Sequence, residues 1–364
     1  MIMNNRNTPV ESTSRSTTDV NVTGFAPLVS PRALKEELPI SDSARETVLA
    51  ARETIGSIID RRDDRLLVVV GPCSIHDPRA AIEYAEKLAA FRRTVEDRLF
   101  VVMRVYFEKP RTLLGWRGFI LDPALDGTND IQAGIRGARR LLLKINELGV
   151  PAGSEMLDPI VPQFIDDLVS WASIGARTTE SQTHREMASG LSMPVGFKNG
   201  TDGSIETATN AQGSSYRPHS FLGIDADGRT CIVHTRGNRR THLILRGGKS
   251  GPNYHEEDVA DALNLLRAAD LPEAIVIDCS HGNSKKDHRR QSAVLKSVVR
   301  QRLDGNAALI GAMVESNLRD GRQDIPSDPK KLLYGVSVTD ACLGWDETAE
   351  SLTWCRNALA RSSR

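Results

Sequence analysis

The sequence has little of what marks a secreted, membrane-bound or nucleic-acid-binding protein. Lys plus Arg and Asp plus Glu both total 47 among 364 residues, so the formal net charge is zero and no overall field favours nucleic acid or an anionic membrane. The first thirty residues contain no apolar run, so neither a secretory signal nor a membrane span is expected there. Five cysteines without CxxC spacing disfavour a disulfide framework and favour a reducing, cytoplasmic setting.

The sequence does have a regular alternation of apolar, β-rich runs with amphipathic segments. The eight runs are Leu66–Cys73, Phe100–Phe107, Pro151–Leu157, Trp171–Arg177, Pro194–Asn199, Thr241–Arg246, Ala274–Ser280 and Ala308–Glu315. Continuously apolar runs are typical of strands buried on both faces. Helix signals lie between them, such as Asp77 before Pro78, and the apolar stripe from Ile131 to Ile145 that Gly149 ends. The pattern predicts an α/β protein built on a (β/α)8 TIM barrel.

A doubly wound open sheet is the main structural alternative. That fold normally carries a glycine-rich phosphate loop after its first strand, and Gly71-Pro-Cys-Ser-Ile-His is not such a loop. The barrel, assigned to residues 61–364, is expected to carry two additions. These are an N-terminal arm and helix over residues 1–60, with a weak strand at Val20–Thr23 and a helix near Ala33–Ile59, and a hairpin across Phe221–Val233, within about 217–236.

Cationic side chains recur where the predicted strands end, which is where barrel enzymes place their active sites. They are Arg104, Lys109, Arg111, Arg177, Lys198 and Arg246. Any one of them is ordinarily a solvated loop charge, and ion pairs with neighbouring acids would account for about two of the six. If all six meet at the C-terminal end of one barrel, they indicate ligands that carry phosphate and carboxylate groups, because the guanidinium group of arginine can form two hydrogen bonds with either.

A second set of strand-end residues has the chemistry of metal ligands. It consists of Cys73, His281, Glu315 and Asp340, the last in the loop after strand eight. A thiolate, an imidazole and two carboxylates suit Mn²⁺, Fe²⁺, Co²⁺ or Zn²⁺. Taken alone, Cys73 would more often be a buried core thiol.

Six motifs around these residues resemble one enzyme family throughout the chain, from about Leu34 to Trp345. They begin at Gly71 (GPCSIHDP), Met103 (MRVYFEKPRT), Gly175 (GARTTESQ), Pro194 (PVGFKNGTDG), Leu245 (LRGGK) and Ser337 (SVTDAC). They closely resemble class I DAHP synthases. That resemblance implies a metal-dependent condensation of phosphoenolpyruvate with erythrose 4-phosphate that releases phosphate, the first step of the shikimate pathway.

The resemblance also implies roles for individual residues. The divalent metal would be held by Cys73, His281, Glu315 and Asp340. The substrate-binding residues would be Arg104, Lys109, Glu155, Arg177, Lys198 and Arg246 around phosphoenolpyruvate, with Pro110, Arg111 and Thr112 at the aldose phosphate. Lys109, His281 and Asp340 are all candidates for proton transfer, and the sequence does not choose among them.

Family members of this type carry an allosteric pocket for an aromatic amino acid, completed by a neighbour's N-terminal arm. The corresponding residues here are Asp158, Pro162, Gln163, Leu191, Ser192, Phe221, Gly223 and Val233. Tyrosine-regulated members of the family place glycine where Gly223 stands, and phenylalanine-regulated ones tend to place serine. The resemblance therefore favours tyrosine as the inhibitor, with phenylalanine and tryptophan as alternatives; the physical reason would be space for the para-hydroxyl. The alternative interpretation is that Gly223 serves only the hairpin backbone, since glycine is common where strands bend. The shared arm predicts a homodimer or homotetramer.

Three other functions remain open on the sequence alone. The related octulosonate phosphate synthase uses a pentose phosphate on the same barrel, although the Lys-Pro-Arg-Thr pattern and the N-terminal extension disfavour it. A Schiff-base aldolase would use Lys198 as its nucleophile. An inactive amino-acid sensor is disfavoured by the complete set of ligands and cations.

Overall fold

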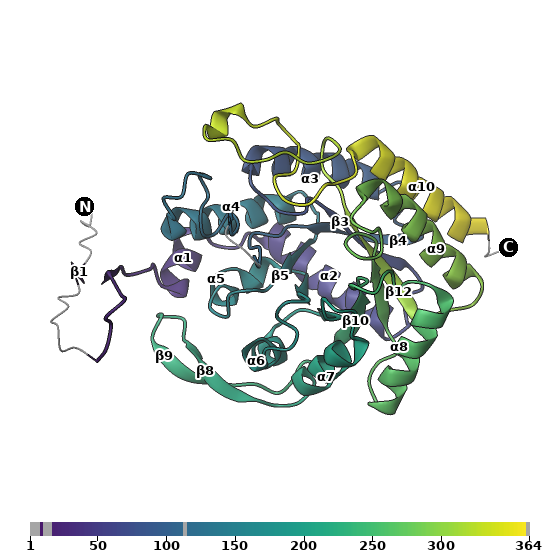
Figure 1. Ribbon diagram of the computed structural model, residues 1–364, viewed down its shortest axis with the longest axis horizontal. Coiled ribbons are helices and arrows are strands. Elements are labelled where there is room, and N and C mark those ends of the chain that lie inside the picture. Colours follow the sequence, from purple (N-terminus) through teal and green to yellow (C-terminus); the bar gives the residue numbers. More distant parts are fainter. Residues whose placement is uncertain (1–7, 10–16, 112–114, 362–364) are drawn as a thin grey trace.

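The computed structural model describes residues 8–9, 17–111 and 115–361, and its main feature is a closed barrel of eight parallel strands (Figure 1). The strands are β3 (Leu66–Gly71), β4 (Leu99–Arg104), β5 (Ala152–Glu155), β6 (Trp171–Ile174), β7 (Val195–Lys198), β10 (Thr241–Leu245), β11 (Ile275–Asp278) and β12 (Leu309–Glu315). They pair in this order, and β12 pairs with β3 to close the ring. The predicted (β/α)8 barrel is confirmed.

Helices connect the strands and cover the outside of the barrel (Figure 1). They are α3 (Pro78–Arg92), α4 (Ile131–Glu147), α5 (Pro162–Ile165), α6 (Gln182–Gly190), α7 (Ile205–Ser215), α8 (Glu256–Ala268), α9 (Gln291–Leu303) and α10 (Trp345–Arg361). Two predicted signals are confirmed. The Asp77 side chain accepts from the Arg79 N–H where α3 begins, and Gly149 adopts a φ of 74° just beyond the end of α4.

The barrel encloses an apolar core that is closed at the N-terminal end of the strands by helix α2 (Asp42–Ile59). Ile55 and Ile58 of this helix pack with inward-facing strand residues such as Val69 and Trp171, and all are nearly inaccessible. A second core lies between the strands and the outer helices. Because side chains fill the lower part of the barrel, ligands can enter only from the opposite end.

The prediction of one helix over Ala33–Ile59 is wrong. The chain forms two helices, α1 (Pro31–Glu37) and α2. Pro39 separates them, because proline cannot donate a backbone hydrogen bond and disfavours helical geometry in the residue before it. The side chain of Ser41 then starts α2 by accepting from a backbone N–H of its first turn.

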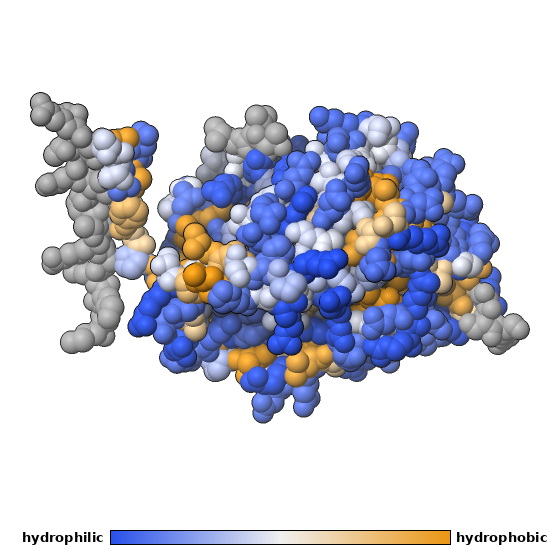
Figure 2. Space-filling model, turned by 90° about the horizontal axis from the view of Figure 1, so that it is seen from below, coloured by the Kyte–Doolittle hydropathy of each residue, from blue (hydrophilic) through white to orange (hydrophobic). Residues whose placement is uncertain are grey.

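The described part of the N-terminal arm stands away from the barrel (Figures 1 and 2). Its short strand β2 (Gly24–Phe25) pairs antiparallel with β1 (Thr8–Pro9). The weak strand predicted at Val20–Thr23 is wrong, since the chain turns there and then runs without a strand partner up to Gly24. Phe25 is 60% exposed, so this arm offers an apolar side chain that the barrel does not bury.

A hairpin follows α7, as predicted, formed by β8 (Ser220–Ile224) and β9 (Thr230–His234). Leu222 stands opposite Ile232 in the register, and these side chains are 88% and 64% exposed. Figure 2, seen from the hairpin side, shows apolar patches within a mainly hydrophilic surface. In the described ranges, no helix combines the length and apolarity that a bilayer crossing requires.

Candidate active site

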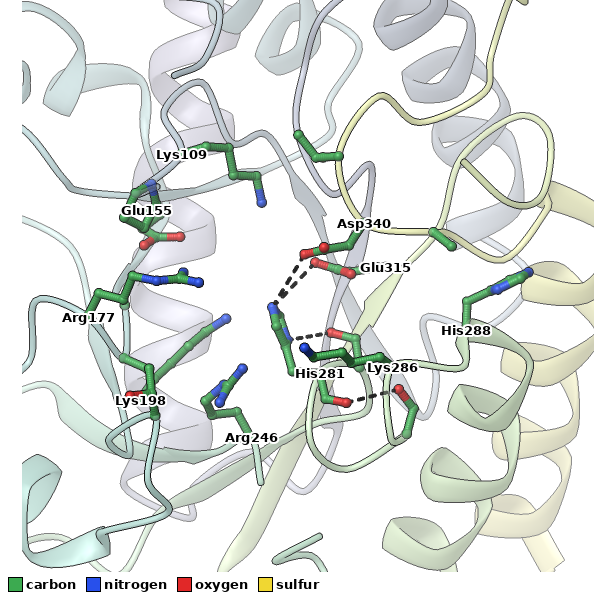
Figure 3. A pocket seen from close by; sticks show the side chains of 18 of the residues that line it. Lys109, Glu155, Arg177, Lys198, Arg246, His281, Lys286, His288, Glu315 and Asp340 are labelled. Carbon is green, nitrogen blue, oxygen red and sulfur yellow. Dashed lines mark hydrogen bonds and ion pairs between the residues drawn. The ribbon is translucent and has the colours of Figure 1, made fainter. Parts of the chain in front are cut away.

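The C-terminal ends of the strands open into a cavity of about 560 Å³ (Figure 3). Its lining includes most of the predicted site residues: Arg104, Lys109, Pro110, Arg111, Glu155, Arg177, Lys198, Arg246, His281, Glu315 and Asp340. Thr112 lies outside the described residues. Parallel strands bring their carboxyl ends to one rim, which is why positions so distant in sequence meet here.

The predicted metal ligands come from three neighbouring strands and one loop. Ligand atoms of Cys73, Glu315 and Asp340 all lie within 4.8 Å of one another, a group able to hold a metal ion. Cys73 follows β3, and Glu315 ends β12, the partner strand of β3. His281 follows β11, and its Nε2 lies 3.9 Å from Oε1 of Glu315 and 3.9 Å from Oδ2 of Asp340. The structure therefore brings all four side chains to one point.

Electrostatics at this point depend strongly on neighbouring charges. Burial raises the pKa of the Cys73 thiol to about 11, so the thiolate needs a nearby cation. Burial also disfavours the charged form of Asp340, but Lys109 and His281 together hold the pKa of this carboxyl below its usual value. The group is therefore suited to a cation, whose charge would stabilise both the thiolate and the carboxylates.

Two cations of the predicted substrate site contact predicted metal ligands directly. Lys109 Nζ donates to Cys73 Sγ at 3.0 Å. Arg104 Nη2 donates to Oε1 of Glu315 at 3.1 Å, and both of these side chains are almost fully buried. The Arg104 guanidinium also lies 3.6 Å from the ring centre of Tyr106. The cationic set and the metal group thus form one connected structure rather than two separate sites.

The remaining cations approach from the other side of the cavity. Figure 3 shows Arg177, Lys198 and Arg246 pointing to the same region, across from Glu315 and Asp340. Lys198 ends β7, and Arg246 follows β10, the strand next to it. The opening between the two groups is where a small molecule with two anionic groups would lie.

Sequence reasoning missed two buried acids beside this cavity. Asp278 ends β11, and its Oδ2 accepts from Lys198 Nζ at 2.8 Å. Glu108 precedes Lys109, accepts from the Asp158 N–H at 3.4 Å, and has a pKa raised to about 8, chiefly by burial. The available signal was a charged residue inside an apolar run, as for Asp278, or directly after one, as for Glu108.

Further cavity-lining residues were also missed. They are Gly175, Ala176, Thr201, Ser280, Ser284, Lys286, His288, Arg322, Thr339 and Ala341. Most stand in the loops after β11 and β12, several residues beyond the end of a strand. Their approach to the cavity depends on loop conformation, as in Lys286, whose φ of 61° is rare for a residue other than glycine.

The predicted effector residues lie on neighbouring segments. Asp158 follows β5, Pro162 and Gln163 are in α5, Leu191 and Ser192 follow α6, and Phe221, Gly223 and Val233 are on the hairpin. Helix α6 packs on β8, and Gln163 lines a groove of about 340 Å³ together with Ala226 of the hairpin turn. That these side chains together form one effector pocket stays a prediction.

Comparison with known proteins identifies the family. The model of the DAHP synthetase I family matches residues 37–353, which is most of the chain. The chain belongs to the DAHP synthetase I family. The resemblance predicted from its six motifs is therefore confirmed.

Individual relatives agree with this assignment. The Tyr-sensitive phospho-2-dehydro-3-deoxyheptonate aldolase of Escherichia coli strain K12 is 52% identical over 330 residues, covering 91% of this chain and 92% of that protein. The Phe-sensitive protein of the same organism is 51% identical over 341 residues, covering 94% and 97%. Because these identities are almost equal, overall similarity does not distinguish between the two effectors.

A solved structure extends the likeness to the fold. The phospho-2-dehydro-3-deoxyheptonate aldolase of Francisella tularensis SCHU S4 superimposes with a TM-score of 0.89 at 47% identity, covering 92% of this chain and 97% of that one. The cavity described above therefore lies at the active-site end of a barrel that this family shares.

Proposed function

We propose that this protein is a DAHP synthase, which condenses phosphoenolpyruvate with erythrose 4-phosphate and water to give DAHP and phosphate. The observation that carries this proposal is the meeting of buried cations with a Cys, His and carboxylate group in one cavity, in a chain of this family. Phosphoenolpyruvate carries a phosphate and a carboxylate, which match the cations on the two sides of the opening.

The donor set at the centre of the cavity fits a divalent metal. Cys73, His281, Glu315 and Asp340 supply one sulfur, one nitrogen and carboxylate oxygens, which suit Mn²⁺, Fe²⁺, Co²⁺ or Zn²⁺. When bound, the metal would act as a Lewis acid that polarises the aldehyde oxygen of the aldose phosphate.

The side chains around this group would position phosphoenolpyruvate and stabilise its charge. Arg177, Lys198 and Arg246 would bind the phosphate, while Arg104 and Lys109 would bind the carboxylate next to the metal ligands. The enol carbon forms a bond to the aldehyde carbon, and water adds to the carbon that bears the phosphate. The carbon–oxygen bond to phosphate then breaks, and inorganic phosphate leaves from the arginine-rich side.

The aldose phosphate would lie on the Lys109 side of the cavity. Pro110 and Arg111 line this part, and the Arg111 Nε already donates to the backbone oxygen of Trp116 at 2.8 Å. Its other guanidinium nitrogens would bind the phosphate, together with Thr112. Lys109, His281 and Asp340 all stand close enough to the centre to transfer a proton, and the geometry supports each of them.

Feedback inhibition by tyrosine is the second part of this proposal. Gly223 has no left-handed φ, so the hairpin backbone does not require glycine there. A Cβ at this position would stand 2.7 Å from Cγ2 of Val233, so the Val233 side chain occupies the space that a side chain at position 223 would need. Packing against Val233 therefore explains the glycine, and the preference for tyrosine is the one that the family resemblance implies.

A homo-oligomer would complete the effector pocket. The arm stands free of its own barrel, and the hairpin exposes Leu222 and Ile232 side by side. Apolar side chains exposed in pairs on an extended hairpin are typical of protein interfaces. A neighbour's arm and hairpin would cover them in a homodimer or homotetramer.

One set of assays tests the proposed reaction against its alternatives. Purified enzyme with a divalent metal should consume phosphoenolpyruvate and release an equal amount of phosphate with erythrose 4-phosphate, and should do so poorly with a pentose 5-phosphate. Preference for the pentose phosphate would favour the octulosonate type. Inactivation by borohydride in the presence of substrate would favour a Schiff base at Lys198, and no turnover with any acceptor would favour the sensor.

A further inference from the structure

Asp278 is a buried carboxylate that contacts both halves of the cavity. It is the last residue of β11 and is 1% exposed. Its Oδ2 accepts from Lys198 Nζ at 2.8 Å and lies 3.1 Å from Nδ1 of His281. Its Oδ1 accepts from the backbone N–H and the hydroxyl of Ser280, at 3.1 and 2.6 Å. One oxygen atom is therefore shared by a proposed phosphate-binding lysine and a proposed metal ligand.

The loop after β11 holds the imidazole in this orientation. His281 has a φ of 57°, and its carbonyl accepts from the Lys286 N–H at 2.8 Å. The next residue, Gly282, donates its N–H to the Arg246 carbonyl at 3.0 Å, which ties this loop to the loop after β10. With the backbone fixed, Nδ1 of His281 faces both Asp278 and the Ser280 hydroxyl, which lies 2.7 Å away and itself donates to Asp278, while Nε2 faces the carboxylates of Glu315 and Asp340.

We propose that Asp278 is a positioning residue that couples metal binding to phosphoenolpyruvate binding through its contacts with His281 and Lys198. The inference rests on the proposed function, which gives His281 and Lys198 their ligands. Asp278 touches neither ligand itself; it acts through the two side chains that do.

Two physical effects support this coupling. A carboxylate that accepts from one imidazole nitrogen fixes the tautomer, so that the other nitrogen carries the lone pair a metal needs. The same carboxylate supplies the countercharge that a buried ammonium requires. When a metal withdraws electrons from His281, its Nδ1–H binds Asp278 more strongly. Lys198 is then less neutralised by Asp278 and attracts a phosphate more strongly.

The test is a titration with Mn²⁺, followed by the electron paramagnetic resonance signal of the free ion, with and without saturating phosphoenolpyruvate. In the wild type, phosphoenolpyruvate should tighten Mn²⁺ binding by about fivefold or more. Asp278→Asn should weaken Mn²⁺ binding by about tenfold to a hundredfold. In this variant, the tightening by phosphoenolpyruvate should fall below about twofold. Unchanged Mn²⁺ affinity or unchanged coupling in Asp278→Asn would overturn the inference.

Asp287→Asn is the matched control, because it makes the same change to a carboxylate of the same loop. The exposed Asp287 side chain accepts from the Arg289 N–H at 3.2 Å and pairs with Arg290, outside the cavity lining. This variant should keep both the Mn²⁺ affinity and the coupling within about threefold of the wild type. If it reproduces the losses of Asp278→Asn, a general change in the loop rather than the Asp278 carboxylate is responsible, and the inference fails.

A measurement on the wild type does not depend on how the variants fold. At a pH high enough to leave one proton on each imidazole, ¹⁵N spectra of labelled histidine in the metal-free enzyme should show the single proton of His281 on Nδ1, assigned by comparison with His281→Asn. A proton on Nε2 would contradict the role of Asp278. These binding and spectroscopic results do not require turnover, so they separate this inference from the proposed reaction, which the acceptor assays test.

Discussion

The two ends of the barrel bury polar side chains in opposite ways. At the C-terminal end, charged groups are buried as pairs, Arg104 with Glu315 and Lys198 with Asp278, and these side chains are at most 5% exposed. At the N-terminal end, α2 closes the barrel with apolar side chains, and the buried polar group there is neutral. The Trp171 Nε1–H donates to Nε2 of His242 at 3.2 Å, and Nδ1 of His242 has no partner among the described residues.

This difference implies that one end of the barrel serves mainly ligand binding and the other mainly the stability of the fold. A buried ion pair loses much of its Coulomb energy to desolvation, so it is a poor way to stabilise a barrel. Such pairs are useful where an anionic ligand or a metal will later compete for one partner. The apolar contacts of α2 have no such competitor and contribute mainly to the free energy of unfolding. Mutations at the two ends should therefore affect different measurements.

The largest expected effect is at the metal group. Cys73→Ala should lower turnover by more than about a hundredfold, because it removes a proposed metal ligand. The free energy of unfolding should change by only about 1–2 kcal/mol, since Cys73 lies at a strand end. Turnover with added Mn²⁺ and urea unfolding check the two expectations. Cys355→Ala, which removes a buried thiol of α10, is the control and should keep full activity. An active Cys73→Ala enzyme in chelator would contradict the metal assignment.

An arginine substitution at each end gives the next largest difference. Arg177→Lys keeps the charge but loses the fork, so the KM for phosphoenolpyruvate should rise by about tenfold. Arg52→Lys, at the closed end, loses bonds to the backbone oxygens of Asp166 and Val169. It should lower stability by about 1–2 kcal/mol and leave KM unchanged. Steady-state kinetics and urea unfolding of both variants would show whether the effects separate; equal KM values would remove Arg177 from the site.

Lowering the pH should reduce the free energy of unfolding through His242, which lies at the N-terminal end of the barrel that α2 closes. Burial lowers the pKa of this imidazole to about 3, so the folded protein binds fewer protons here than the unfolded chain, whose histidine has a pKa near 6.5. This contribution to stability is therefore complete above about pH 6.5 and is lost as the pH falls, by about 2 kcal/mol at pH 5. Urea unfolding at pH 7 and pH 5 should show a smaller loss in His242→Gln. An identical loss in both proteins would show that His242 is not the group responsible.

The smallest expected effect is on regulation. Gly223→Ser should raise the tyrosine concentration for half inhibition by about threefold or more while sparing kcat, because the hairpin lies outside the catalytic cavity. Thr230→Ala, on the other strand of the hairpin and exposed, should leave inhibition unchanged. Wild-type enzyme that ignores millimolar tyrosine would reject the choice of effector but not the reaction.

The barrel could be predicted from the sequence because a strand that is buried on both faces is a continuously apolar run. Its main error in the strands was at their C-terminal ends, as in the run Trp171–Arg177, where β6 stops at Ile174. At those ends the chain leaves the sheet to form site loops, yet some of its residues remain buried and apolar, such as Val105 and Phe107 after β4. The helix break at Pro39 was readable in principle, but the helical pattern on both sides concealed it.

The candidate site was predictable to the extent that it consists of residues at strand ends. Arg104, Lys198 and Glu315 qualify, because a charge that ends a buried strand must face the cavity. Asp278 also ends a strand, but its role depends on which cation lies beside it, and the sequence does not contain that distance. Lys286 was unpredictable, because its position depends on a left-handed backbone conformation in a loop.

The most direct test of the central claim is the consumption of phosphoenolpyruvate by enzyme stripped of metal with a chelator. With erythrose 4-phosphate present, the stripped enzyme should be inactive, and a stoichiometric amount of Mn²⁺ should restore phosphoenolpyruvate loss together with equal phosphate release. Undiminished activity of the stripped enzyme, or no activity after Mn²⁺ is added, would contradict the account of a metal-dependent condensation at the open end of the barrel.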